Sequence, residues 1–208
     1  MGKRVWVLVS VVALGVALTA PAAGAGDADE EAQAVIDDVL LTGADAPAGY
    51  EEVEFREAPI PDASECKGFR RSEKQERKQP QGGVIFGDPN GPSFVSDEVV
   101  VFPKAKAAKR YARGYADGED CLETVFTEAF SGAGFEGIAP RFDDLGDQTI
   151  SYSFILDFPE EGAQLVVDIV LVRVGAVVTG LNFQGVGAPM PEADAIVELT
   201  VERMEEAA

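Results

Sequence analysis

The stretch 149–183 constrains the fold more than any other part of the chain. In residues 149–158 apolar side chains alternate with small or polar ones, which is typical of a strand with one buried and one wet side. Residues 165–174 are apolar on both sides with two charged exceptions, so they predict a strand inside the sheet. After a short turn, residues 177–183 alternate again. Three consecutive strands with short links predict an antiparallel meander.

The rest of the chain predicts helices and strands that do not alternate one for one. This order favours an α+β fold in which helices pack on an antiparallel sheet that ends in the meander. The expected helices are 29–41, a segment from Pro103 to Gly118, a shorter one around 121–130, and a closing one around 196–204. The expected strands are a segment near 50–55 and an antiparallel pair at 82–87 and 95–102. The expected irregular segments are a long charged loop at 62–82 and a glycine-rich break at 132–137.

Residues 1–25 have the pattern of an export signal. Lys3 and Arg4 precede an apolar run that is short for a membrane anchor, and Ala23 and Ala25 provide the small side chains that a signal peptidase requires. We therefore expect cleavage after Ala25.

The remaining chain fits one domain. Residues 26–31 are small and acidic and predict a flexible lead-in, and residues 32–208 predict a single α+β domain that is large enough to bury its own core. No later segment is apolar for long enough to cross a bilayer. We expect a protein that is secreted, either extracellular or held in the cell envelope.

The chain has two cysteines, Cys66 and Cys121. Outside the cytoplasm an even number of cysteines favours pairing, so we expect one disulfide bond. A loop of that length would stabilise the fold by about 4 kcal/mol in the chain-entropy model.

Composition excludes several classes of function. The formal net charge is -20, which disfavours binding to nucleic acid. The chain has no histidine, and this removes serine and cysteine triads and most zinc sites. We therefore expect no catalytic residue, no metal site and no cofactor.

Positive charge is concentrated in one part of this acidic chain. Eleven of the 17 basic residues lie between residues 67 and 113, and the disulfide would hold the two basic segments near each other. Such a patch would suit an anionic envelope polymer, an anionic lipid or an acidic protein. The candidate ligand-binding residues are Lys67, Arg70, Arg71, Lys106, Lys109, Arg110 and Arg113. The alternative is that these side chains form an ordinary solvated face.

Two groups of acidic residues are candidates for a metal or catalytic site. The run Asp143, Asp144 and Asp147 lacks the ligand spacing of a calcium loop, so turn formation explains it better. Asp157 and Asp168, on neighbouring predicted strands, are the nearest approach to a catalytic carboxylate pair, and Glu98 would join them if its strand were adjacent.

Several short segments together resemble a known family. They are 40–42 with 46–50, Cys66, the run 96–103 with its alanine-rich helix, Cys121, residues 145–147, 167–175 and the last helix. This order resembles actinobacterial exported domains related to the extracellular sensor domain of mycobacterial-type receptor serine/threonine kinases. The resemblance covers about residues 35–205.

The resemblance implies a non-catalytic α+β domain with a cleft that binds an envelope ligand. This chain differs from the receptor form in lacking a kinase domain and a membrane anchor, so we expect that it does not signal alone. The first hypothesis is thus a secreted, sensor-like binding domain. The second is a carrier of an apolar ligand such as a lipid, which predicts an apolar cavity of several hundred Å³ between sheet and helix. The third is a carboxylate-based hydrolase.

Overall fold

The structure is a computed structural model, and it describes residues 27–54, 61–130 and 132–208. The predicted export signal, the start of the lead-in and the end of the predicted strand near 50–55 lie outside these ranges. No helix in the described ranges has the length and apolar character needed to cross a membrane.

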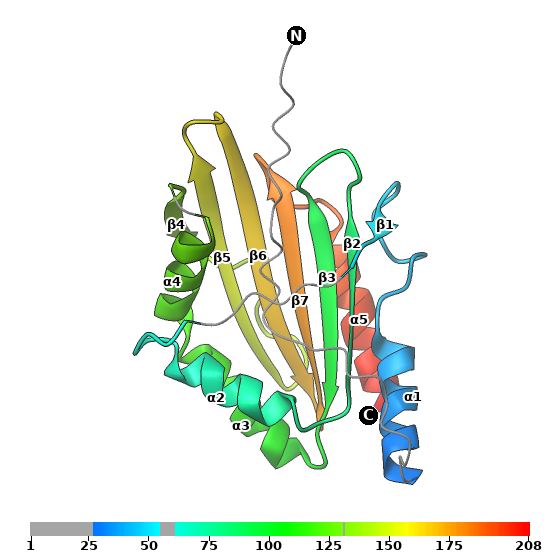
Figure 1. The fold of residues 1–208 in the computed structure, drawn as a ribbon. Coiled ribbons are helices and arrows are strands. Elements are labelled where there is room, and N and C mark those ends of the chain that lie inside the picture. The colour runs from blue at the N-terminus through cyan, green and yellow to red at the C-terminus, as the bar shows by residue number, and fades with distance from the viewer. Residues whose placement is uncertain (1–26, 55–60, 131) are drawn as a thin grey trace.

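The described residues form a seven-stranded antiparallel sheet with the order β1-β2-β3-β7-β6-β5-β4 (Figure 1). The strands are β1 (Glu51–Glu52), β2 (Gln81–Gly87), β3 (Phe94–Val101), β4 (Gly134–Ile138), β5 (Gln148–Phe158), β6 (Ala163–Val174) and β7 (Val177–Val186). The predicted pair at 82–87 and 95–102 is β2 and β3, and the predicted meander is β5, β6 and β7. Both predictions are confirmed.

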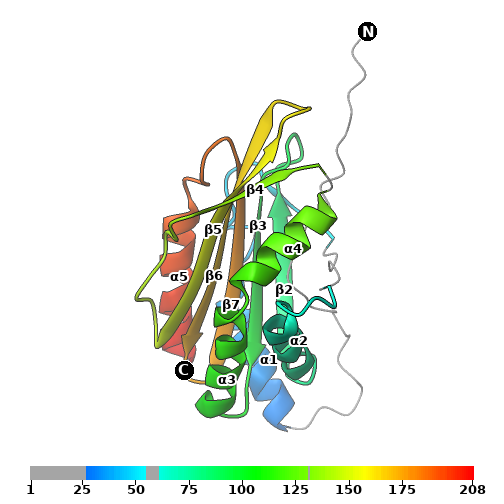
Figure 2. The same cartoon turned by 90° about the vertical axis from the view of Figure 1, so that its left-hand side faces the viewer.

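Helices cover both faces of the sheet (Figures 1 and 2). The helices are α1 (Asp27–Val39), α2 (Lys67–Glu76), α3 (Ala105–Ala116), α4 (Glu119–Ala129) and α5 (Ala193–Ala207). Helices α1 and α5 pack on one face, and α2, α3 and α4 pack on the other. The α+β class is confirmed.

The sheet separates two hydrophobic cores, and β6 contributes to both. Leu165, Val167 and Ile169 point toward α3 and α4, whereas Val170 and Val172 point toward α1 and α5. This double burial explains why the sequence of β6 is apolar without alternation.

Three predictions of local structure are wrong. The loop expected at 62–82 contains the helix α2, because Phe69, Ser72 and Glu76 form one buried face at helical spacing. The break expected at 132–137 overlaps the edge strand β4, whose backbone pairs with β5 despite two glycines. The flexible lead-in expected at 26–31 is helical from Asp27 onward.

Cys66 and Cys121 form a disulfide bond, as predicted. Cys66 directly precedes α2, and Cys121 lies in the first turn of α4. Both sulfur-bearing side chains are fully buried. The bond therefore ties the start of α2 to α4 on the same face of the sheet.

Candidate functional site

Helices α2 and α3 lie side by side at one end of the sheet (Figure 1). They approach each other closely where Gly68 faces Gly114, since a Cβ added to Gly68 would lie 2.5 Å from the carbonyl oxygen of Gly114. One turn further along α2, Ser72 Oγ donates a hydrogen bond of 2.9 Å to the carbonyl oxygen of Tyr111. Three small residues thus let the two backbones approach, and the basic side chains of both helices share one surface.

The outward sides of α2 and α3 are basic. The buried residues of α3 face the sheet and those of α2 contact α3, so the exposed positions at helical spacing point to solvent. We define the basic surface as seven exposed cations: Lys67, Arg71, Lys74 and Lys78 at α2 with Lys106, Arg110 and Arg113 on α3. None of these seven forms an ion pair in the part of the chain that the structure describes.

The structure places five of the seven candidate ligand-binding residues on the basic surface, and the other two lie elsewhere. Arg70 lies on the far side of α2, where it forms an ion pair with Asp62. Lys109 lies on the side of α3 that faces away from α2, toward Asp147. There a backbone hydrogen bond from Gly175, then Arg173 and, more weakly, Lys109 lower the pKa of Asp147.

The opposite face of the sheet is acidic. Helices α1 and α5 expose many carboxylates and no cation in their last turns. The exposed acids there are Asp29, Glu30, Glu31, Asp37 and Asp38 on α1, and Asp194, Glu198, Glu202, Glu205 and Glu206 on α5. Helix α4 also begins with two acidic residues. Positive charge is therefore concentrated on the pair α2 and α3.

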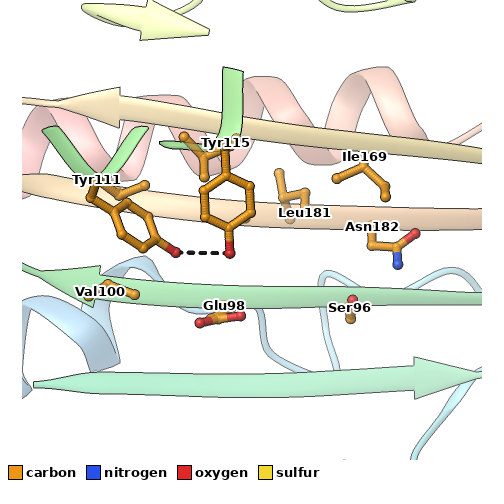
Figure 3. A pocket seen from close by; sticks show the side chains of 11 residues that line it. Ser96, Glu98, Val100, Tyr111, Tyr115, Ile169, Leu181 and Asn182 are labelled. Atoms are coloured by element: carbon orange, nitrogen blue, oxygen red, sulfur yellow. Dashed lines mark hydrogen bonds between the residues drawn. The ribbon is translucent and has the colours of Figure 1, made fainter. Parts of the chain in front are cut away.

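A small polar cavity lies between α3 and the sheet (Figure 3). Tyr111 and Tyr115 line it from α3, Ser96 and Glu98 from β3, and Asn182 from β7. Its volume is about 40 Å³, which is room for only a few water molecules.

Beside this cavity the buried carboxylate of Glu76 is hydrogen-bonded to the phenol of Tyr111. Tyr111 Oη donates a hydrogen bond of 2.5 Å to Glu76 Oε2 and lies 3.3 Å from Tyr115 Oη. Burial and the nearby charge of Glu76 raise the pKa of both tyrosines well above 10. Both phenols therefore stay neutral at physiological pH and act as hydrogen-bond partners, not as bases.

The carboxylates proposed as a catalytic pair are not paired. Asp168 is opposite Ser153 and Asp157 is opposite Gln164, four residues further along the ladder. At about 3.4 Å per residue this separates the two acids by about 14 Å along the strands, which exceeds the range for glycosidases. Glu98 lies on the other face of the sheet.

Asp168 instead has a structural role. It is buried, accepts a hydrogen bond of 2.6 Å from Ser153 Oγ and forms an ion pair of 3.1 Å with Arg141. Arg141 also pairs with Asp194 at the start of α5. This group ties the segment after β4 to the closing helix.

The acidic loop residues Asp88 and Asp147 form hydrogen bonds within the protein. Asp88 Oδ1 accepts the backbone N–H of Asn90 at 2.8 Å, and Asp147 binds Arg173 and the backbone N–H of Gly175. Within the described ranges no group of three or more carboxylate or thiol side chains is arranged to hold a metal ion.

Sequence reasoning missed the buried polar residues under α3. Tyr111 and Tyr115 lie on the buried side of α3, and the polar residues around them come from β3, β7 and the unexpected helix α2. The available signal was the polar residues Ser96 and Asn182 at inward positions of predicted strands.

No family model matches the chain, and no curated protein sequence matches it. A solved structure does: the extracellular domain of PknH from Mycobacterium tuberculosis superposes with a TM-score of 0.59. The match covers 86% of this chain and 96% of that one, at 14% sequence identity. At this identity the likeness shows a shared fold. It confirms, at the level of fold, the resemblance to the extracellular domains of mycobacterial-type receptor kinases.

Proposed function

We propose that this protein is an extracellular, non-enzymatic, sensor-like domain that binds an anionic ligand of the cell envelope through the basic surface. Export is supported by the pattern of residues 1–25 and by the disulfide between Cys66 and Cys121. An extracellular location is further supported by the fold shared with the extracellular domain of PknH.

The observation that carries the proposal is the concentration of positive charge on α2 and α3. In a chain with 37 acidic and 17 basic residues, the basic surface exposes seven cations that form no ion pair with the described residues, while the helices on the other face expose carboxylates. Because separated surface charges steer and retain ligands of opposite sign, the basic surface favours a polyanionic partner.

The first turns of these helices support the same conclusion. Neither α2 nor α3 has an acidic residue in its first turn, although both stand in an acidic chain, and each has a lysine there: Lys67 and Lys106. Cations at this end of a helix are unfavourable by a few tenths of a kcal/mol or more. A bound anion would remove that cost.

The two alternatives receive less support. A lipid carrier requires an apolar cavity of several hundred Å³, whereas the cavity under α3 measures about 40 Å³ and is lined in part by polar groups. A carboxylate hydrolase requires two acids across a cleft, and Asp157 and Asp168 are too far apart along the ladder.

The test is binding to two anionic probes, soluble polyphosphate and vesicles that contain phosphatidylglycerol. The variant Arg71→Gln/Arg110→Gln removes two charges from the basic surface. At about 1 kcal/mol per charge, we expect affinity to fall by about 10- to 30-fold at low salt and by much less at high salt.

The matched control is Ala34→Glu/Ala195→Glu, which changes net charge by the same amount at exposed positions of α1 and α5. It should change affinity by less than about threefold, because it lies across the sheet. Equal losses in the two variants, or no binding of the unaltered protein to either probe, would overturn the proposal.

A further inference from the structure

A groove opens on the basic surface between the C-terminal end of α2 and the N-terminal end of α3. Its volume is about 240 Å³. Its lining has an apolar part, Phe102, Pro103 and Ala107, which we call the floor, and two exposed cations, Lys78 and Arg110, which we call the rim. The side chains of Gln75 and Gln79 complete the lining.

We infer that this groove seats the phosphate head group of an anionic phospholipid at a membrane surface. The inference rests on the proposed function and names the class of ligand. Lys78 and Arg110 have no ion pair in the described chain, so both are available to a phosphate. A guanidinium and an ammonium are the two side-chain groups that proteins use most for phosphate oxygens.

The floor distinguishes a lipid from a soluble polyanion. A polyphosphate has no apolar part, so it would not bury the apolar surface of Phe102, Pro103 and Ala107. A phospholipid carries its phosphate next to glycerol carbons and the first methylenes, which would cover this apolar area while the phosphate contacts the rim.

The size of the groove limits how much of the lipid enters. At about 240 Å³ it is below the range of pockets that enclose a drug-sized molecule, so it holds a head group but not two acyl chains. The chains remain in the bilayer. The other cations of the basic surface, such as Arg71 and Arg113, then lie over neighbouring head groups.

The decisive variant fills the groove without changing charge. Ala107→Gln places a longer side chain on the floor, and glutamine is compatible with a helix. We expect affinity for vesicles of phosphatidylglycerol and phosphatidylcholine in equal parts to fall at least about fivefold, while affinity for polyphosphate changes by less than about twofold. The matched control, Ala116→Gln, makes the same substitution at an exposed position of α3 away from the groove and should leave both affinities unchanged.

A second pair of variants tests the rim. Lys78→Gln should weaken vesicle binding about fivefold, as expected for one charge at a membrane surface. Lys109→Gln removes the same charge from the side of α3 that faces Asp147 and should have less than about twofold effect. Circular dichroism of each variant establishes that the fold is retained.

The outcomes separate this inference from the proposed function. If Ala107→Gln folds and binds vesicles as well as Ala116→Gln does, the groove is not the head-group site, although the basic surface still binds anions. If the unaltered protein binds polyphosphate but not the vesicles, the ligand is a soluble polyanion and the inference is wrong. Failure to bind either probe overturns both.

Discussion

Asp97 is a carboxylate buried in the centre of the sheet. It accepts hydrogen bonds from Thr179 Oγ1 at 2.6 Å and from the backbone N–H of Leu41 at 3.0 Å, just after α1. Loss of solvent raises its pKa from 3.8 to about 6, although these hydrogen bonds and the more distant Arg203 oppose the rise. One strand residue therefore links the pH of the medium to the attachment of α1.

Asp97 predicts a falling stability as pH rises from about 4 to about 6. In that interval the folded protein keeps a proton that the unfolded chain has released, so folding is favoured most below pH 4, and the advantage is lost above pH 6. This rise in the pKa of Asp97 corresponds to a change of about 3 kcal/mol in the free energy of unfolding. In urea unfolding at several pH values, the unaltered protein should lose about 3 kcal/mol more stability than Asp97→Asn between pH 4 and pH 6.

Asp45 provides the control for this titration. Its burial is outweighed by hydrogen bonds from Arg203 and Thr42, so its pKa is lowered and it titrates below the same interval. Asp45→Asn should therefore leave the slope between pH 4.5 and 6.5 unchanged. Parallel curves for the unaltered protein and Asp97→Asn would contradict the role given to Asp97.

Among the elements, α2 is the clearest example of a helix that the local sequence does not predict. Its buried face consists of Phe69, Ser72 and Glu76, and only the first is apolar. Ser72 and Glu76 are tolerated there because Tyr111, far along the chain, provides their hydrogen bonds. No local pattern indicates such partners, so this charged stretch of the sequence predicts a loop.

The strands that were predicted correctly are determined by patterns within a few consecutive residues. The alternation in 149–158 and the unbroken apolar run in 165–174 each follow from which faces of a strand are buried. The edge strand β4 has no such pattern, because Gly134 and Gly137 contribute no side chain and its pairing depends on β5. The groove depends on the tertiary placement of α2 beside α3, and the cavity depends on the placement of α3 over the sheet, so neither was predictable.

The close packing of α2 and α3 predicts a destabilising Gly68→Ala substitution. The added Cβ would meet the backbone of Gly114, and backbone atoms cannot turn away as a side chain can. We expect the free energy of unfolding to fall by about 2 kcal/mol, because the steric cost exceeds the gain of about 1 kcal/mol in helix propensity. Gly137→Ala in β4, where a Cβ meets nothing within 4 Å, should be neutral within about 0.5 kcal/mol. A Gly68→Ala protein of unchanged or greater stability in urea would contradict this packing.

For the whole molecule, the central prediction is export with processing. When the full sequence is expressed in a Gram-positive host, the protein in the medium should lack residues 1–25 and should carry Cys66 and Cys121 as a disulfide. Intact-mass measurement before and after reduction checks both points, since reduction adds two hydrogens. Protein that remains in the cells with its full N-terminus, or that reacts with a thiol reagent without reduction, would contradict this location.

The cations on α2 and α3 and the carboxylates on α1, α4 and α5 give the molecule an electric dipole. In the field of a polyanionic wall or membrane, this dipole produces a torque before any contact is made. A diffusing molecule would rotate until α2 and α3 lead and α1 and α5 trail. Collisions would then be productive more often than random orientation allows, and this advantage would disappear once salt shortens the range of the field.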